Sequence, residues 1–364
     1  MSTSLAAVFS GEAGKIELRE ITRPEPARGE ILVRTLGCTL CGSDLHTFEG
    51  RRQAAVPTVL GHEIVGQIVA FGNEAPRQDL AGQSLQPGDR VSWSLVASCD
   101  DCFFCQRGLP QKCLNSVKYG HEALQPGREL LGGLAEHCLI VPGTSLVRLP
   151  EDLPLEVACP ANCATATAAA AIEAAGALEG CSICILGAGL LGLTVSAMAR
   201  TCGAVEVICV DVEPLRRAKA TLFGASQAPS PAELAETVKQ LTEGRGVDIA
   251  FELSGSPEAF AAAWPMVRTG GSFVVVGAVF PSSPVELPLE QLVRRHLTLR
   301  GIHNYAPHHL LRAIQFLHQH QQTFPFRELV SDWYPLSRVE QALRSARDIS
   351  RIRVGVRPDS NHTP

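Results

Sequence analysis

Residues 38–46 read CTLCGSDLH and, after a short spacer, residues 61–66 read GHEIVG. Cys41 and His62 are 21 positions apart, and Glu63 follows the histidine directly. A thiolate and a neutral imidazole are ligands that zinc prefers, and a catalytic zinc site needs one more protein ligand and an open position. Groups that can transfer protons or orient ligands lie close to Cys41: Ser43, Asp44 and His46. The stretch therefore predicts a metal centre with acid–base groups beside it.

The composition is that of a compact globular enzyme. At 364 residues the chain is long enough for two domains, each with its own core. Its formal net charge of −5 argues against a nucleic-acid binder, which usually has a basic excess. An uncharged stretch, residues 157–172, is interrupted by Pro160 and Asn162, and no basic segment followed by an apolar run begins the chain. We therefore expect a cytoplasmic protein with neither a secretion signal nor a membrane span.

The chain contains 13 cysteines. In a small secreted protein such a number would indicate disulfides, but this chain is large and resembles a cytosolic protein in composition. Metal ligation together with buried free thiols is the better interpretation.

The expected secondary structure changes near residue 162. Residues 1 to about 95 carry short β-type runs broken by proline and glycine, without a convincing long helix. After Asn162, an Ala-rich helix leads into an alternation of strands and helices. We expect a helix at 190–202 and strands at 182–186, 205–210, 249–253, 272–276 and 297–300. The alternation predicts an α/β fold with a doubly wound parallel sheet, preceded by a mostly β domain.

The C-terminal part is expected to contain two more helices, at 308–320 and 336–348, and a strand at 352–356. The first of these helices carries four histidines that we expect to be exposed to solvent: His308, His309, His318 and His320.

Four cysteines follow one another with the spacing C-x2-C-x2-C-x7-C: Cys99, Cys102, Cys105 and Cys113. Four thiolates so close in sequence can complete a tetrahedral shell around zinc without help from distant residues. Close cysteine spacing also serves iron–sulfur clusters, and unrelated thiols or disulfides are a third alternative. The spacing favours a structural metal site.

A glycine motif, GAGLLG, occupies residues 187–192, after one expected strand and at the start of a helix. Backbone amides at such a helix N-terminus can face a pyrophosphate, so the candidate cofactor contacts are Gly187, Gly189, Leu190 and Gly192. Asp211 closes the next strand, where a carboxylate accepts hydrogen bonds from the adenosine ribose and repels a 2′-phosphate. The motif predicts NAD. Arg216, a further candidate contact, and Arg217 follow soon after, and they leave NADP as the alternative.

These motifs occur in an order that resembles the zinc-containing medium-chain dehydrogenases, the alcohol and polyol dehydrogenase family. The resemblance covers nearly the whole chain. It implies a GroES-like, mostly β catalytic domain at residues 1–163 and 303–364, with a structural-zinc lobe near residues 95–118, and a Rossmann NAD-binding domain at 164–302. It also implies two zinc ions per chain, hydride transfer between a small alcohol or aldehyde and NAD, and a homodimer or homotetramer.

The resemblance assigns roles around the catalytic zinc. Cys163 matches the third ligand, beside Cys41 and His62; the alternative is that Cys163 is a small helix-packing residue. Glu63 resembles the family glutamate that lies behind the metal. Asp44 resembles the carboxylate that orients the histidine ligand, a partner that imidazole ligands generally require. The four cysteines of the lobe would hold the structural zinc.

Further roles concern protons and the cofactor. Ser43 resembles the hydroxyl that takes the alcohol proton, and His46 resembles the relay that carries it towards solvent. Thr167 resembles the family threonine that contacts the nicotinamide. By the same resemblance, Gly277 and His303 would line the nicotinamide and substrate cleft.

Gly42 stands where some alcohol dehydrogenases carry a basic residue, which favours the polyol and threonine dehydrogenase side of the family. The segments 102–113, 118–122 and 161–166 resemble a subgroup labelled as alcohol dehydrogenases associated with phosphonate catabolism. Two rival classes are a zinc-free quinone or enone reductase of the same superfamily and a non-enzymatic, crystallin-like or regulatory protein. The matched metal ligands argue against the reductase, and no ligand has been lost.

The segment 112–128 suggests how a substrate would be recognised. It carries a group of basic residues against Glu122: Lys112, Lys118, His121 and Arg128. Our hypothesis is that Arg128, with His121 as an additional donor, binds an anionic tail, phosphonate or carboxylate. The alternative is a solvated surface loop.

Overall fold

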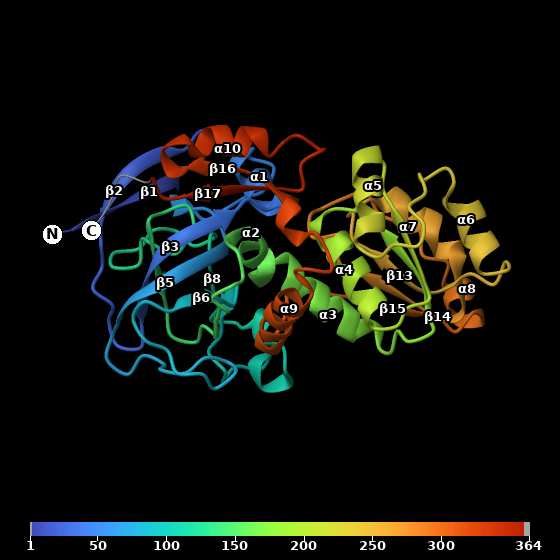
Figure 1. Cartoon of the computed structure of the whole chain (residues 1–364), viewed down its shortest axis with the longest axis horizontal. Helices are drawn as coiled ribbons and strands as arrows, with labels where there is room; N and C mark the ends of the chain where they lie inside the picture. Colours follow the sequence, from blue (N-terminus) through green and yellow to red (C-terminus); the bar gives the residue numbers. More distant parts are fainter. Residues whose placement is uncertain (1, 360–364) are drawn as a thin grey trace. The chain divides into compact units, whose positions relative to one another are not determined.

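The computed structural model describes residues 2–359, which form two compact units (Figure 1). One unit contains the chain up to Ala166, the segment Ala306–Gln322 and the described residues from Phe326 onward. The other contains Thr167–Tyr305 and Thr323–Pro325. The N-terminal and C-terminal parts of the chain therefore share one unit, which we call the catalytic unit; we call the other the nucleotide unit.

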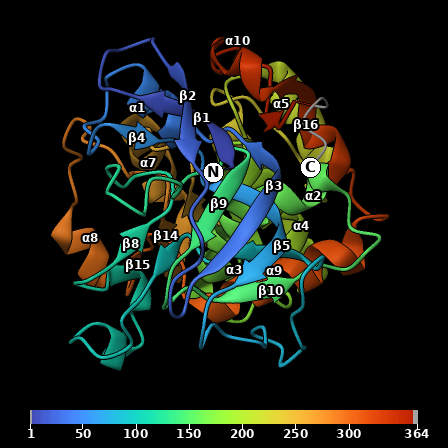
Figure 2. The ribbon, with the colours of Figure 1, turned by 90° about the vertical axis from the view of Figure 1, so that its left-hand side faces the viewer.

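The catalytic unit is built on a seven-stranded sheet. Six strands run in the order β10-β6-β5-β3-β17-β16, and β9 pairs with β3. Their bounds are β3 Ile31–Thr39, β5 Glu63–Phe71, β6 Arg90–Trp93, β9 His137–Ile140, β10 Leu146–Arg148, β16 Val330–Pro335 and β17 Arg353–Arg357. Figure 2 shows β9, β3 and β5 side by side. A smaller sheet has the order β2-β1-β4, with bounds Glu17–Thr22, Thr3–Phe9 and Thr58–Val59.

Strand β3 is the centre of this architecture because it pairs with β5, β9 and β17. Its apolar run Ile31-Leu-Val is buried, as expected for a strand covered on both faces. The strand ends at Thr39, two residues before Cys41, so the sheet core fixes the position at which the first candidate ligand emerges.

Short elements surround the sheets of the catalytic unit. The helices are α1 Gly42–Phe48, α2 Leu155–Ala158, α9 Pro307–His320 and α10 Val339–Ser345, and α3 Ala164–Ala175 begins where this unit ends. Single 3-10 turns are η1 Cys105–Arg107, η2 Pro110–Lys112, η3 Cys159–Asn162, η5 Phe326–Leu329 and η6 Leu336–Arg338. The pair β7 Val96–Ala97 and β8 Val117–Lys118 frames the four-cysteine segment.

Two details differ from the sequence expectations. The helix expected at 336–348 is divided into η6 and α10 and ends at Ser345. His309 was expected to be exposed, but it is only 7% exposed. It lies at the third position of α9, where its Nδ1 approaches the backbone N–H of Ala306 at 3.1 Å. A helix start needs such partners for its unpaired N–H groups, which explains the burial.

The nucleotide unit contains a parallel sheet with the order β12-β11-β13-β14-β15. The strands are β11 Ser182–Leu186, β12 Glu206–Val210, β13 Val247–Glu252, β14 Val267–Val275 and β15 Thr298–Gly301. They alternate with helices α4 Leu190–Thr201, α5 Pro214–Leu222, α6 Leu234–Leu241, α7 Pro257–Ala263 and α8 Leu289–Arg294, and η4 Trp264–Met266 follows α7. The predicted doubly wound α/β domain is confirmed, with each predicted strand present within a few residues of its expected bounds.

An isolated parallel bridge between Ile208 and Gln227 extends this sheet beyond β12. With that bridge counted as a very short outer strand, the sheet follows the strand order 3-2-1-4-5-6 of the dinucleotide-binding fold. Ligands of such sheets bind outside the carboxyl ends of the strands. A cavity of about 470 Å³, lined in part by Glu252, Gly255 and Ala278, opens at this edge after β13 and β14.

Among the described residues, no single helix has both the length and the apolar character needed to cross a membrane. The bent helix pair Leu155–Asn162 and Ala164–Ala175 meets those two criteria when its members are taken together.

Candidate metal centres and nucleotide loop

Cys41 lies between the end of β3 and the start of α1, with extended backbone angles of φ −88° and ψ 160°. As the residue before the helix, it leaves its own N–H without a helical partner. Asp44, three positions later, accepts that N–H through Oδ2 at 2.9 Å. The short helix therefore fixes the direction of the Cys41 side chain through a neighbouring carboxylate.

The same carboxylate joins Cys41 to the GHE segment. Asp44 Oδ1 lies 3.1 Å from His62 Nδ1 and accepts the Gly61 N–H at 3.2 Å. Both Asp44 and His62 are 1% exposed. Because Nδ1 faces a carboxylate, Nε2 is the nitrogen available to a metal. Burial lowers the pKa of His62, but Asp44 and Cys41 outweigh burial and raise the pKa to about 10. The surroundings of the His62 ring therefore favour a positive charge.

Cys163 follows η3, and Asn162 anchors that turn in the sheet. The Asn162 amide donates to the carbonyls of His62 at 2.9 Å and Trp93 at 3.0 Å, and its Oδ1 accepts the Ile64 N–H at 3.3 Å. Asn162 is fully buried. These bonds connect Cys163, the third candidate ligand, to β5, which begins directly after His62.

Glu63 is fully buried behind the ligands and is paired with Arg353. Arg353 Nε and Nη2 reach the Glu63 carboxylate at 3.0 and 3.1 Å, and the Thr39 hydroxyl donates to it at 2.6 Å. Burial raises the pKa of Glu63, and Arg353 opposes the rise. Arg353 Nη2 also lies 3.7 Å from Cys41 Sγ. The guanidinium thus stabilises one carboxylate and one thiolate at once.

These elements bring together one ligand atom each from Cys41, His62, Glu63 and Cys163, all within 4.8 Å of one another. A hydrogen bond between the two thiols lowers the pKa of Cys41 and raises that of Cys163. Two sulfurs and an imidazole nitrogen suit zinc, and Glu63 supplies an oxygen behind them. The residues fit a catalytic zinc.

Ser43 and His46 lie on the same short helix as Asp44, three positions apart and therefore on one face. Both are partly buried. Burial, followed by the nearby Arg51, lowers the pKa of His46, so its imidazole is neutral at neutral pH. The arrangement places a hydroxyl and a neutral imidazole beside Cys41.

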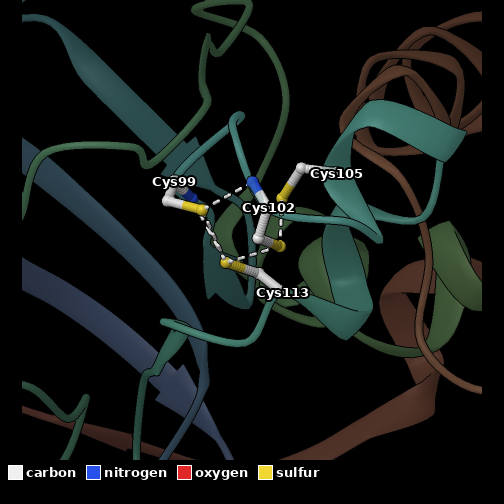
Figure 3. A group of neighbouring side chains, drawn as sticks. All are labelled: Cys99, Cys102, Cys105 and Cys113. Carbon is white, nitrogen blue, oxygen red and sulfur yellow. Dashed lines mark hydrogen bonds between the residues drawn. The ribbon is translucent and has the colours of Figure 1, made fainter.

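The four-cysteine segment forms a second cluster (Figure 3). Cys102 Sγ lies 3.5 Å from Cys105 Sγ and 4.0 Å from Cys113 Sγ, and Cys113 Sγ lies 3.4 Å from Cys99 Sγ. Backbone N–H groups of Cys99, Cys102, Leu114 and Asn115 donate to these sulfurs. The amide bonds, first that from Leu114, lower the pKa of Cys102 to about 6.

The sulfur separations distinguish between the alternatives for this lobe. Four ligands at a Zn–S distance of roughly 2.3 Å stand about 3.8 Å apart at the corners of a tetrahedron. The separations of 3.4–4.0 Å fit that shell. In an iron–sulfur cluster, thiolates that bind different irons stand further apart. All four cysteines are free thiols, which removes the disulfide alternative.

The glycine motif turns sharply between β11 and α4. Gly187 has φ +103°, and Gly189 precedes the first residue of the helix. A Cβ on Gly192 would lie 1.8 Å from the Gly187 carbonyl oxygen, so only glycine allows the helix to approach the turn this closely. The predicted strand–turn–helix context of a pyrophosphate loop is therefore present.

Asp211 follows β12 and lies directly beside this loop. Its Oδ2 accepts the Ala188 N–H at 2.7 Å, and its Oδ1 accepts the Glu213 N–H at 2.8 Å. Arg216 Nη1 lies close to Gly189: a Cβ added to Gly189 would be 3.9 Å from this nitrogen. Arg217 donates to the carbonyls of Asp211 and Val212. The carboxylate thus supports the loop in addition to being a candidate ribose partner.

Comparison with known proteins agrees with both units. The model of the alcohol dehydrogenase GroES-like domain matches residues 27–151, and that of zinc-binding dehydrogenases matches residues 191–319. L-threonine 3-dehydrogenase of Pyrococcus horikoshii is 30% identical over 313 residues, which cover 83% of this chain and 84% of the relative. The chain belongs to the zinc-binding dehydrogenase family.

A second relative and a solved structure agree with this family assignment. A probable zinc-binding alcohol dehydrogenase of Mycobacterium tuberculosis is 32% identical over 301 residues, 81% of this chain and 74% of the relative. The crystal structure of an alcohol dehydrogenase from Thermotoga maritima has a TM-score of 0.92 and 28% identity, and covers 99% of this chain and 100% of the other. This zinc-binding dehydrogenase is thus an oxidoreductase of the medium-chain type with a GroES-like and a Rossmann-type part.

Three other residues singled out in the sequence lie in the nucleotide unit of this zinc-binding dehydrogenase. Thr167 is in the first turn of α3 and partly buried, and His303 is exposed after β15. Gly277 follows β14, and its N–H donates to the Glu252 carbonyl at 2.9 Å. Their roles towards a nicotinamide remain predictions.

The structure gives Arg128 a partner within the chain that the sequence did not indicate. Arg128 is exposed and forms an ion pair of 3.2 Å with Glu30, because the turn after residue 125 faces the start of β3. His121 contacts a different guanidinium: its Nε2 lies 2.6 Å from Arg52 Nη1. Arg52 was not singled out from the sequence.

Arg353, Thr39 and Asn162 were also missed as parts of the centre. Their positions carry weak local signals: Thr39 is within the stretch CTLC, and Asn162 directly precedes Cys163. Arg353 lies 290 positions after Glu63, and no local pattern indicates that pairing.

Zinc content tests the two centres. The purified protein should contain about two zinc ions per chain. Cys163→Ser and Cys105→Ser should each lose about one, whereas Cys202→Ser, at an exposed cysteine outside both clusters, should lose none. Mass spectrometric metal analysis measures this. Retention of both ions in Cys163→Ser would assign the third ligand elsewhere.

Asn162→Leu tests the anchor of η3. The substitution leaves two buried carbonyls and one N–H without their partner, at roughly 1–3 kcal/mol each. We expect the melting temperature to fall by roughly 5–15 °C and the catalytic zinc to bind more weakly. Asn73→Leu, at an exposed asparagine, is the control in thermal unfolding. An equal, small shift in both variants would show that the anchor is not needed.

Proposed function

We propose that this protein is an NAD-dependent zinc alcohol dehydrogenase, which oxidises the CH–OH group of a small alcohol or reduces the corresponding aldehyde or ketone. The convergence of Cys41, His62 and Cys163 carries the proposal. The glycine loop and Asp211 in the nucleotide unit support it, as does the membership of the family.

Cys41, His62 and Cys163 would hold the catalytic zinc, and the four cysteines of the lobe would hold the structural zinc. When bound in the catalytic centre, zinc supplies a Lewis acid that polarises an alcohol or carbonyl oxygen. Asp44 holds His62 in the orientation that exposes Nε2, and Arg353 pairs with the Glu63 carboxylate behind the ligands. These two buried pairs keep the site preorganised.

Two residues of α1 transfer the proton of the alcohol. Ser43 accepts it through the hydroxyl oxygen while the Ser43 hydroxyl proton passes on, and His46 takes the proton towards solvent. The neutral state of the His46 imidazole, which follows from its lowered pKa, suits it to accept a proton. A bound nicotinamide would supply the redox chemistry as the hydride acceptor.

NAD rather than NADP is proposed because of Asp211. A carboxylate at the end of the second strand accepts hydrogen bonds from the ribose hydroxyls and repels a 2′-phosphate. Arg216, close to the loop, is the feature that favours NADP instead. The carboxylate outweighs it, since Asp211 is held against the loop by the Ala188 N–H.

A zinc-dependent threonine or polyol dehydrogenase is the alternative within the same reaction class. The threonine dehydrogenase relatives favour it. A zinc-free quinone or enone reductase is disfavoured, because such an enzyme has no use for the two convergent ligand sets.

The direct test is NADH formation, followed by absorbance, with a panel of primary, secondary and polyol alcohols and with L-threonine. Removal of zinc should abolish the activity, and zinc should restore it in the wild type. Cys163→Ser should lose nearly all activity and remain inactive after zinc is added, whereas Cys202→Ser should behave as the wild type. Full activity of Cys163→Ser, or turnover of quinones alone, would contradict the proposal.

Asp211→Ser tests the cofactor choice. Loss of ribose hydrogen bonds to a carboxylate should weaken NAD binding by roughly 2–4 kcal/mol and reduce the discrimination against NADP. Dissociation constants for both cofactors, measured by fluorescence titration, give the ratio. Glu213→Gln removes a charge from the same turn and should leave the ratio unchanged. If Asp211→Ser also leaves it unchanged, the ribose binds elsewhere.

A further inference from the structure

We infer that Arg52 and Lys118, with His121 as a positioning residue, form a subsite beside the catalytic metal centre for an oxyanion carried by the alcohol substrate. A carboxylate, a phosphate and a phosphonate share the chemistry that this subsite recognises. The inference rests on the proposed function and narrows its substrate class to anionic alcohols.

Arg52 and Lys118 come from segments next to the metal ligands. Arg52 follows α1, and its backbone N–H donates to the His46 carbonyl at 3.0 Å. Lys118 ends β8 and is partly buried. Burial and then Arg52 lower the pKa of Lys118, while the thiolates of Cys163 and Cys41 act in the opposite direction. The ammonium is therefore within electrostatic reach of both the guanidinium and the metal ligands.

His121 fixes the guanidinium. Its Nδ1 lies 2.8 Å from the Tyr119 carbonyl oxygen, which can only accept, so Nδ1 carries the hydrogen. Nε2 is then an acceptor for Arg52 Nη1 at 2.6 Å. The His121 ring is 5.3 Å from the His62 ring, centre to centre. His121 thus orients Arg52 next to the metal centre, and it does not donate to an anion as the sequence suggested.

The segment that carries Lys118 and His121 is held rigidly. Tyr119 is fully buried, and its hydroxyl accepts the Val141 N–H at 3.0 Å and bonds Thr144 at 2.8 Å. Gly120 has φ +75°, and a Cβ there would lie 2.7 Å from the Gly61 carbonyl oxygen. The segment therefore packs directly against the residue before His62. A rigid support of this kind is what a binding subsite requires.

The two cations differ from neighbouring arginines in their pairing. Arg51 pairs with Glu49, Arg128 with Glu30 and Arg353 with Glu63. Within residues 2–359, no carboxylate lies within ion-pair distance of the Arg52 guanidinium or the Lys118 ammonium.

Two acids of these segments, Glu122 and Asp44, are already in use. Glu122 accepts the Lys118 backbone N–H at 2.7 Å, and Asp44 is bonded to Cys41, Gly61 and His62. Partly desolvated cations without a counter-ion are costly to maintain, which indicates an anionic ligand. A guanidinium binds two oxygens of an oxyanion side by side, and an ammonium adds a third contact.

The test compares matched alcohols with the zinc-loaded enzyme and NAD. The anionic substrates are 3-hydroxypropionate and 2-hydroxyethylphosphonate, and the neutral one is 1,3-propanediol. We expect the wild type to show at least a 10-fold higher kcat/KM for one or both anionic alcohols. Arg52→Gln and Lys118→Gln should each lower the anionic-to-neutral ratio of kcat/KM at least 10-fold, mainly through KM, because the contact is made before and during the reaction.

Controls separate this effect from a general loss of charge. Arg51→Gln and Arg128→Gln remove neighbouring guanidiniums that are already paired, and they should change the ratio less than 2-fold. His121→Phe keeps a packed ring but removes the acceptor for Arg52, so it should lower the ratio through KM as well. Equal effects of Arg51→Gln and Arg52→Gln would overturn the subsite.

A binding measurement gives a readout that does not depend on turnover. Calorimetric titration with methylphosphonate and with acetate should show binding of at least one to the wild type, at least 10-fold weaker in Arg52→Gln. The preferred probe distinguishes phosphonate from carboxylate. If neutral alcohols are oxidised as well as anionic ones and neither probe binds, the subsite is wrong and the dehydrogenase proposal stands. If methylphosphonate binds through Arg52 but no alcohol is oxidised, the dehydrogenase proposal fails instead.

Discussion

The buried carboxylate of Asp44 is the interaction on which the candidate catalytic centre depends. It accepts the Cys41 N–H, the Gly61 N–H and faces His62 Nδ1, so one side chain connects the end of β3 to the GHE segment at the start of β5. A buried carboxylate is stable only with such partners, and here every partner belongs to the metal centre. The ligand geometry and the local fold are therefore one structural unit: loss of Asp44 would free Cys41 and His62 together.

Local patterns explain why much of this was predictable. The strands of the nucleotide unit are apolar runs between turns, and the glycine motif requires a close approach of α4 to Gly187 that only glycine permits. The four cysteines of the lobe are near in sequence, so their convergence needs no distant element. Family resemblance added Cys163, which the structure brings to Cys41 and His62. In each case the information lay within about 25 residues or in a known motif.

The parts that were missed depend on contacts between distant segments. Arg353 meets Glu63 because β17 pairs with β3, and Arg52 meets His121 because the 118–122 segment packs against Gly61. A sequence shows that a basic residue is present but not which acid it will face. Arg128 illustrates the difficulty: it is close to His121 in sequence, yet the fold pairs it with Glu30. Charge pairing across a tertiary fold is set by packing, not by local propensity.

The distribution of charge around the centre supports the proposal of an anionic alcohol as substrate. With zinc bound, the thiolates of Cys41 and Cys163 would balance the divalent cation, and Arg353 balances Glu63. Asp44 is the remaining acid, and two further cations, Arg52 and Lys118, lie near the centre. One positive charge therefore has no counterpart among these groups. An oxyanion on the substrate restores the balance, and because burial weakens screening by solvent, its placement beside the metal would fix which end of the alcohol reacts.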